Sequence, residues 1–192
     1  MKILSKLIIV ASIFISGHVT AASIGWGSSP SPIYVGDTFS VDITGSGFTS
    51  TVDGGGVNFS YDNSIFNVTS VTIGSVWDPL ISSQGATNNG AGTVDGLYVN
   101  TFGAVDGNAD VTGNFVVATV EFLAVGLGTS ALELSEYGLN PWASGGSLLN
   151  PGFQGTALTV NSLGEVPIPA AAWLFGSGLL GLAGMARRKK AA

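Results

Sequence analysis

Apolar and polar positions alternate with a period of two residues along the middle of the chain. In the segment 38–44, Phe39, Val41 and Ile43 alternate with polar residues. Successive side chains of a β-strand point to opposite faces of a sheet, so this pattern predicts a strand with one buried face. No segment of residues 23–165 keeps the apolar period of an amphipathic helix, so we expect few helices there.

Further segments with the same alternation predict a set of short strands. They are 57–61, 66–73, 93–102, 115–125, and two short strands around Leu132 with Leu134 and Leu158 with Val160. In the segment 66–73 the apolar residues change phase, which predicts a β-bulge near Thr69-Ser70. The segment 115–125 carries apolar residues on both faces, as expected of a central strand that is covered on both sides.

Glycine-rich segments separate these strands and predict turns and loops. We expect turns at residues 45–47 and 53–56, and longer loops at residues 77–92 and 139–155. Short strands separated by such turns are typical of a β-sandwich or a β-barrel, so the fold class is predicted to be all-β. Residues 23–165 have about the length of one ordinary domain.

The N-terminus has the three parts of a secretory signal peptide. Positively charged residues come first, an apolar run at 7–15 follows, and small residues then allow cleavage after Ala21 or Ala22. We therefore predict that residues 1–22 are a signal peptide that signal peptidase removes. The alternative is an uncleaved N-terminal membrane anchor.

The C-terminus combines a proline pair, an apolar run and a basic end. The uncharged apolar run covers residues 170–186, and a helix of this length would span roughly 26 Å, close to the thickness of a thin bilayer. The cations after it would be held on the cytoplasmic side of the membrane. We therefore predict a transmembrane helix between a proline motif and a basic tail, which are formed by Val166, Pro167, Ile168, Pro169 and by Arg187, Arg188, Lys189, Lys190.

Charge is distributed unevenly along the chain. All six Lys and Arg residues lie at positions 2, 6 and 187–190, whereas all twelve Asp and Glu residues lie between Asp37 and Glu165. Because the single histidine is His18, residues 23–165 contain no Lys, Arg or His. Nucleic acid is not expected as a partner, since phosphate binding relies on Lys and Arg. Thiol catalysis, Ser-His-Asp chemistry, zinc sites and haem ligation lack their usual residues, while oxygen ligands suited to Ca²⁺ and sugars remain.

Asp106, Asn108 and Asp110 have the alternate spacing with which a calcium-binding loop begins. The pattern then departs from an EF-hand, because Val111 stands where the sharp turn needs Gly and Val117 where a bidentate Glu belongs. Two interpretations stay open: a partial calcium site completed by backbone carbonyls, or an acidic turn exposed to solvent. Calcium is the one candidate cofactor.

Several aromatic residues are candidates for stacking against sugar rings, since an aromatic face packs well on the apolar face of a pyranose. They are Trp77, Tyr98, Tyr137, Trp142 and Phe153. Trp142 and Trp77 are the principal candidates, and Trp142 is expected to be exposed because its loop is rich in Pro, Gly and Ser. Packing of these rings in the core or in loops is the alternative, and for the set as a whole it is the favoured one.

Catalysis would need a pair of carboxylates that act as acid and base across a glycosidic bond. The candidate pairs are Asp62 with Glu121, and Glu133 with Glu136. The spacing along the chain selects neither pair, and a domain of this size is small for a glycosidase with a cleft. We therefore expect no enzyme activity.

Three segments resemble parts of a cohesin-type domain. Residues 35–41 (Val-Gly-Asp-Thr-Phe-Ser-Val) are similar to its opening strand, and residues 58–68 resemble its tyrosine–aspartate turn between two strands. Residues 117–126 resemble one of its late strands. The resemblance covers most of residues 33–161 and implies a jelly-roll β-sandwich of about nine strands, related to carbohydrate-binding modules. It also implies a protein partner, since cohesins bind dockerins.

The segment 166–192 resembles the PEP-CTERM sorting signal of Gram-negative bacteria. Residues 171–182, Ala-Ala-Trp-Leu-Phe-Gly-Ser-Gly-Leu-Leu-Gly-Leu, match it together with the basic end, whereas Ile168 stands where the motif has Glu. The resemblance implies recognition by an exosortase, cleavage near residues 166–169, and a link to exopolysaccharide and biofilm matrix. The alternative is a plain C-terminal membrane anchor.

These patterns together predict an exported protein of the cell surface or extracellular matrix, held at the inner membrane until it is processed. The exported domain, residues 23–165, is predicted to bind an extracellular polysaccharide or a surface protein rather than to catalyse a reaction. The alternatives are a purely structural role in the matrix and, less favoured, a small polysaccharide-active enzyme that uses carboxylates.

Overall fold

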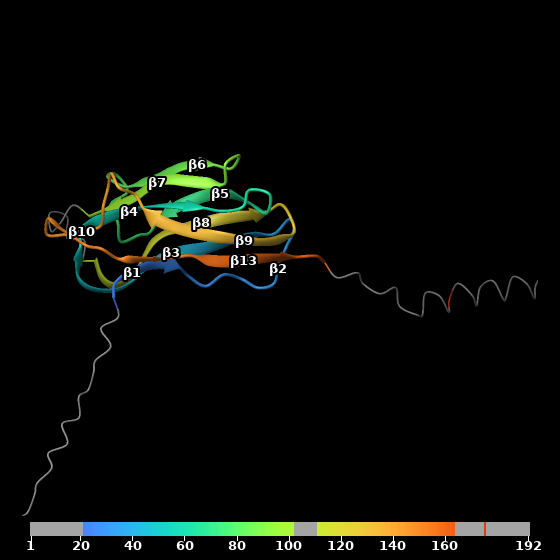
Figure 1. Ribbon diagram of the computed structural model, residues 1–192, viewed down its shortest axis with the longest axis horizontal. Coiled ribbons are helices and arrows are strands. Elements are labelled where there is room, and N and C mark those ends of the chain that lie inside the picture. The colour runs from blue at the N-terminus through green and yellow to red at the C-terminus, as the bar shows by residue number, and fades with distance from the viewer. Residues whose placement is uncertain (1–20, 102–110, 164–174, 176–192) are drawn as a thin grey trace, which may run out of the picture. The chain divides into compact units, whose positions relative to one another are not determined.

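The computed structural model describes residues 21–101, 111–163 and 175, and these residues form thirteen β-strands (Figure 1). The chain divides into two compact units, Met1–Asn161 and Ser162–Ala192, and every described strand belongs to the first of them. The prediction of an all-β fold is therefore confirmed for the described residues.

The strands range in length from two residues to fifteen. In chain order they are β1 (Ser23–Trp26), β2 (Ile33–Tyr34), β3 (Thr38–Val52), β4 (Gly54–Ser60), β5 (Phe66–Ile73), β6 (Ser83–Asn88), β7 (Thr93–Asn100), β8 (Val111–Ala124), β9 (Gly128–Glu136), β10 (Ala143–Ser144), β11 (Ser147–Leu148), β12 (Gly152–Gln154) and β13 (Thr156–Asn161). The alternating segments predict seven strands, and the cohesin resemblance implies about nine. The predicted loops 77–92 and 139–155 contain β6 and the short strands β10 to β12, and β1 and β2 were not among the predicted segments.

Two sheets pack against each other as a β-sandwich (Figure 1). The smaller sheet has the order β12-β1-β3-β8-β5, and β3 and β8 form its long antiparallel pair. The larger sheet has the order β11-β10-β4-β9-β13-β2, and β7 and β6 extend it on the other side of β4. Consequently β6, β7, β4 and β9 lie side by side in that order.

The alternating patterns identified the main strands correctly. In β3 the side chains of Phe39, Val41 and Ile43 are buried, while the residues between them are exposed or half-buried. β5 contains the predicted bulge, because its register with β8 shifts between Val68 and Ser70. β8 lies between β3 and β5, as predicted for a central strand. Its second face is only half-buried at Thr119, Glu121 and Leu123, so the prediction that it is covered on both sides is wrong.

The turn predicted at residues 45–47 is wrong, because β3 runs through it. The break predicted at 53–56 is confirmed only at Asp53, where the chain passes from the smaller sheet to the larger one, since residues 54–56 belong to β4. β3 continues as far as Val52, and β4 already begins at Gly54. β3 stays paired with β8 beyond Gly45, although the register between the two strands shifts there. The glycines in these segments therefore need a different explanation.

Close packing of large rings on the backbone supplies that explanation. A Cβ atom at Gly45 would overlap the ring of Phe115, and a Cβ atom at Gly55 would overlap the indole ring of Trp142. A glycine inside a strand often marks such a close approach, since any side chain would occupy the space of the ring. These glycines serve packing within strands rather than a change of chain direction.

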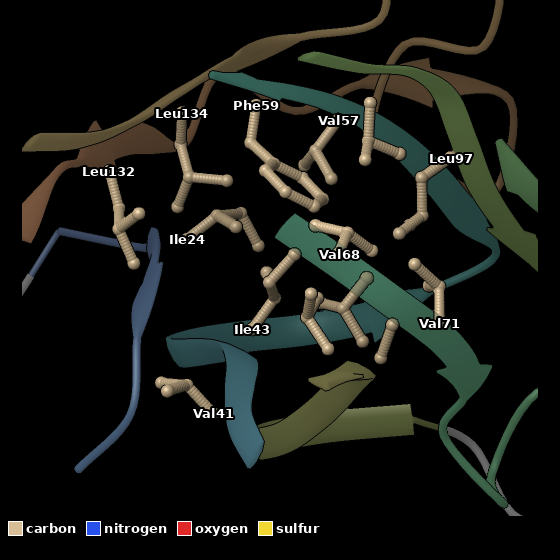
Figure 2. Close-up of a cluster of buried hydrophobic side chains, with 14 of the residues drawn as sticks. Ile24, Val41, Ile43, Val57, Phe59, Val68, Val71, Leu97, Leu132 and Leu134 are labelled. Atoms are coloured by element: carbon tan, nitrogen blue, oxygen red, sulfur yellow. The ribbon is translucent and has the colours of Figure 1, made fainter. Parts of the chain in front are cut away.

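Phe122 of β8 lies among aromatic side chains from both sheets. Its ring centroid lies 5.7–6.4 Å from those of Trp26, Phe39, Phe59, Tyr61 and Phe66. Aromatic rings at such separations add to the stability that their buried area already supplies. Figure 2 shows the aliphatic part of the same core, where Val41 and Ile43 of the smaller sheet face Val57 and Leu134 of the larger one.

No helix among the described residues is long and apolar enough to cross a membrane. The predicted transmembrane helix 170–186 lies outside the described residues except for Phe175, and so do residues 1–20 of the predicted signal peptide. Both stay predictions from the sequence.

Replacing Gly55 with alanine should destabilise the domain, because the added methyl group would collide with the buried indole ring of Trp142. Overpacking of this kind lowers the free energy of unfolding by about 1–3 kcal/mol. Chemical denaturation of the Gly55→Ala variant measures the loss.

Gly138→Ala is the matched control, because a Cβ atom at Gly138 would meet no other part of the chain within 4 Å. The free energy of unfolding of this variant should change by no more than about 0.5 kcal/mol. Equal losses in the two variants would contradict the role assigned to the Gly55 contact.

Candidate binding surface

The outer face of β6, β7, β4 and β9 carries three rows of residues that run across the strands. Strand register sets the rows, because buried residues such as Val57, Phe59 and Leu97 alternate with residues that point outward. The rows are Tyr137, Gly56, Tyr98 and Ser83; then Ser135, Asn58, Asp95 and Ala86; then Glu133, Ser60, Thr93 and Asn88. We call this surface the tyrosine face.

Two tyrosines form the aromatic part of the tyrosine face. The rings of Tyr98 and Tyr137 stack with their centroids 6.3 Å apart and their planes 11° from parallel. Tyr137 lies directly on glycine backbone, since a Cβ atom at Gly56 would come within 2.9 Å of its Cβ and one at Gly96 within 3.4 Å of its Cζ. Both tyrosines are half-buried, so the pair is held in place while part of each ring stays accessible.

Asn58 holds the backbone beneath this pair. Its Oδ1 accepts a hydrogen bond from the backbone amide of Gly96 at 2.7 Å. Gly96 has a φ of +73°, a left-handed conformation that favours glycine, and the register between β4 and β7 shifts between Val57 and Phe59. The side chain of Asn58 thus satisfies the amide that this irregular pairing would otherwise leave without a partner.

Two carboxylates, Asp95 and Glu133, also lie on the tyrosine face, and both are exposed. The hydroxyl of Thr93 donates to Oδ2 of Asp95 at 3.1 Å. Glu133 lies against Gly155, where a Cβ atom would come within 2.7 Å of its Oε2. Residues 23–165 contain no basic side chain, so neither carboxylate has a cation of its own domain to pair with.

The prediction that Trp142 and Trp77 are platforms for sugar stacking is wrong. Trp142 is 0% and Trp77 is 2% exposed, so neither ring has a free face. Both belong to a buried aromatic cluster with Phe115 and Phe48, and the indole nitrogen of Trp77 donates to a backbone carbonyl of β8 at 2.8 Å. Phe153 packs against the core as well, so of the five aromatic candidates the structure brings only Tyr98 and Tyr137 together on a surface.

The four carboxylates considered for catalysis engage separate partners. Asp62 accepts hydrogen bonds from the hydroxyl and from the backbone amide of Ser64. Both bonds lower the pKa of its carboxyl group, and the bond from the hydroxyl has the larger effect. Glu121 accepts from a threonine hydroxyl of β5, and Glu136 from the backbone amide of Trp142, whereas Glu133 lies on the tyrosine face. Glu133 and Glu136 are three residues apart in β9 and therefore point to opposite faces of the larger sheet. Asp62 follows β4 of the larger sheet, whereas Glu121 belongs to β8 of the smaller one.

The predicted calcium ligands Asp106, Asn108 and Asp110 lie outside the described residues, and so do the proline motif 166–169 and the basic tail 187–190. Among residues 21–101, 111–163 and 175, no group of three or more His, Cys, Asp or Glu residues is placed to hold a metal ion.

The smaller sheet has a shallow hollow of about 530 Å³, lined by Thr44, Gly45, Ser46, Asn114, Phe115 and Val116. Its polar groups are already engaged by the fold. Thr44 donates to a carbonyl of β1, Ser46 pairs with a serine hydroxyl of β1, and Asn114 accepts from a backbone amide of β3. The tyrosine face, with two accessible rings and two unpaired carboxylates, is therefore the stronger candidate for binding.

Sequence reasoning named Tyr98 and Tyr137 only as separate aromatic residues and did not select Asn58 or Asp95. One signal was present, because Asn58 and Tyr98 occupy outward positions in segments whose alternate residues are apolar. These residues lie side by side because β4 pairs with β7 and β9. The sequence pattern of any one of these segments does not predict that pairing.

Replacing Asn58 with alanine should loosen the backbone under the tyrosine pair, because the amide of Gly96 would lose its acceptor. The free energy of unfolding should fall by about 1–3 kcal/mol, the cost of leaving such a group unsatisfied. Hydrogen exchange at the Gly96 amide should become faster, which mass spectrometry or NMR can measure.

Asn114→Ala is the control for this substitution. Asn114 also accepts from a backbone amide, but at 3.3 Å and at an exposed position of the other sheet. Its removal should change the free energy of unfolding by no more than about 0.5 kcal/mol. An unchanged exchange rate at Gly96 in the Asn58→Ala variant would refute the positioning role.

The fold is shared with solved structures of low sequence identity. The chain is similar to a type I cohesin–dockerin complex structure from Clostridium thermocellum, with 13% identity, a TM-score of 0.60, and coverage of 74% of this chain and 100% of the other. It is similar to a non-cellulosomal cohesin from Archaeoglobus fulgidus, with 15% identity, a TM-score of 0.58, and coverage of 76% and 95%. For the solution structure of CaCohA2 from Clostridium acetobutylicum the identity is 18%, the TM-score 0.54, and the coverage 78% and 96%.

No curated protein matches the chain. The cohesin domain family matches residues 28–135, which is more than half of the chain and covers the strands from β2 to β8 and all but the last residue of β9. This match agrees with the two-sheet topology and with the similarity to solved cohesins. The chain belongs to the cohesin domain family.

Proposed function

We propose that this cohesin-family chain is an exported, non-catalytic binding module whose tyrosine face docks a protein partner. The observation that carries the proposal is the stacked pair of Tyr98 and Tyr137 on the outer face of the larger sheet. Tyrosine is enriched at the residues that contribute most to protein–protein affinity. A pair already held by Gly56 and Gly96 loses little further conformational freedom when a partner covers it.

The surroundings of the pair suit a protein partner. Small polar side chains, such as those of Ser60, Ser135 and Thr93, lie among the other residues of the face and leave the sheet open to another molecule. Hydroxyl groups of this kind can exchange water for hydrogen bonds with a partner at the rim of an interface.

The structural relatives support a partner of the dockerin type. Several of the similar structures are named as complexes of a cohesin with a dockerin, two of them from Clostridium thermocellum and two from Acetivibrio cellulolyticus. We extend this kind of partner to the present chain, with the tyrosine face as the site of contact.

We further propose that both termini serve export and sorting. Signal peptidase would remove residues 1–22, and an exosortase would recognise 166–169 and cleave nearby, so the module would pass from the inner membrane to the cell surface or matrix. The charge pattern supports this route, since all cations of the chain lie in the two segments that would be removed.

Intact-mass measurement of the exported protein tests the sorting proposal. We expect a mass that lacks residues 1–22 and the segment following the cleavage at 166–169. A chain truncated after Glu165 should no longer be retained at the cell envelope. A mature protein that still ends at Ala192 would contradict cleavage.

The docking proposal is tested by capture and titration. The tagged full chain is used to capture a partner from the exported proteins of the producing cells, and the recovered protein is purified and titrated by calorimetry. Tyr98→Ala and Tyr137→Ala should each raise the dissociation constant at least about tenfold. Truncation of a central aromatic residue lowers the binding free energy by roughly 1.4 kcal/mol or more.

Tyr34→Ala is the matched control, because Tyr34 is a half-buried tyrosine of β2, at the far edge of the same sheet. Its removal should leave the dissociation constant within about twofold. An affinity that does not respond to Tyr98 or Tyr137 would overturn the proposal. Retention of purified exopolysaccharide in place of a protein, lost in the same two variants, would reassign the tyrosine face to sugar binding.

A further inference from the structure

The side chain of Asn89 links the two sheets. Asn89 lies in the turn between β6 and β7 of the larger sheet, and its Nδ2 donates to the carbonyl of Val68 in β5 of the smaller sheet at 3.0 Å. Its Oδ1 accepts from the backbone amide of Val68 at 2.8 Å and from the hydroxyl of Tyr61. The side-chain amide of Asn89 therefore takes the place of a neighbouring strand at this edge of β5.

Asn89 is followed by Gly90, and the two residues form the only Asn-Gly pair in the chain. In such a pair the backbone nitrogen of the glycine can attack Cγ of the asparagine, because no side chain hinders its approach and a five-membered ring results. Gly90 is exposed, and its amide has no hydrogen-bond acceptor among the described residues. Solvent can thus remove the proton that this nitrogen has to lose before it attacks.

The hydrogen bonds to Asn89 suit this attack. Attack on Cγ turns Oδ1 into an oxyanion, and the Val68 amide and the Tyr61 hydroxyl already donate to that oxygen. Two donors directed at a developing oxyanion stabilise the tetrahedral intermediate, as in an oxyanion hole. Burial raises the pKa of Tyr61, so its hydroxyl keeps its proton and remains a donor in mildly alkaline solution.

We propose that Asn89 is a site of spontaneous deamidation, promoted by the two donors that the fold places on its Oδ1. The Gly90 nitrogen gives up its proton and forms a bond to Cγ, and the bond from Cγ to Nδ2 breaks. Nδ2 takes up a proton and leaves as ammonia. Water then opens the cyclic imide to aspartate or isoaspartate, so one water is consumed, one ammonia is released, and no oxidant or reductant is needed.

The product holds the two sheets together less well. An ionised carboxylate accepts hydrogen bonds but cannot donate one to the carbonyl of Val68. Isoaspartate in addition lengthens the backbone of the turn by one carbon atom. Deamidation should therefore loosen the β6–β7 turn from the edge of β5 as the exported protein ages.

The test compares deamidation of the full chain in native buffer with deamidation in concentrated guanidinium chloride at the same pH. Mass spectrometry follows the gain of about 1 Da in the peptide that contains Asn89. The peptides are made with a protease that cleaves after aromatic residues, since residues 23–165 contain no Lys or Arg for trypsin. The native chain should deamidate at least as fast as the unfolded chain. A slower rate in the native chain would show that the fold protects Asn89 and would overturn the proposal.

Two variants test the attacking group and the donor. A Cβ atom at Gly90 would meet only Oδ1 of Asn88, at an ordinary 3.4 Å, so Gly90→Ala should fold normally. Its deamidation should be at least about tenfold slower, because the methyl group hinders the attack. Tyr61→Phe keeps the ring but removes one donor, and its rate should fall at least about threefold. An equal or higher rate in Tyr61→Phe would refute promotion by this hydroxyl.

Asn89→Asp reproduces one product and tests the consequence for the fold. Hydrogen exchange at the Val68 amide should be faster in this variant than in the native chain, because the link to the β6–β7 turn is weakened. The melting temperature should also fall. Unchanged exchange at Val68 would refute the loosening of the turn.

Discussion

Burial of apolar side chains between the two sheets is the interaction on which the rest of this molecule depends. The chain has no cysteine, and residues 23–165 have no basic side chain, so neither a disulfide nor an ion pair between side chains can stabilise this part. The backbone hydrogen bonds of the two sheets and the core around Phe122 have to provide the stability. This requirement explains why most aromatic rings among the described residues, including those of Trp77 and Trp142, are buried in the interior.

Glycine residues within strands make room for these rings, because they have no side chain. Inside the sandwich, the rings of Phe115 and Trp142 lie on Gly45 and Gly55. On the outside, the ring of Tyr137 lies on the residue that follows, Gly56. Adjacent residues of a strand point to opposite faces, so neighbouring glycines of β4 accept one ring on the core side and one on the solvent side. The packing of the core and the position of the tyrosine pair are thus linked through the same short segment.

The carboxylates on the two outer faces of the sandwich differ in their hydrogen bonds and in their exposure. On the smaller sheet, Asp42 and Glu121 each accept a hydrogen bond of 2.6 Å from a threonine hydroxyl, which ties them into the sheet. On the larger sheet, Glu133 lies exposed beside Ser60, and Asp95 has a longer bond of 3.1 Å. The face with stacked tyrosines is therefore also the face whose carboxylates are more readily available to another molecule. Aromatic contact and available charge on one surface together favour a binding role over a purely structural one.

The sequence alone determined the all-β class, the buried faces of β3 and β5, the bulge in β5 and the cation-free character of the domain, because each depends on neighbouring residues or on composition. Tertiary structure decided which aromatic rings are accessible and whether a glycine turns the chain or receives a ring. A loop rich in Pro, Gly and Ser is expected from its sequence to be exposed. Trp142 is nevertheless buried, because its indole ring occupies the space that a side chain at position 55 would fill. Tyr98 and Tyr137 meet only because β4 lies between β7 and β9. The sequence of one strand does not specify which distant segments pair with it.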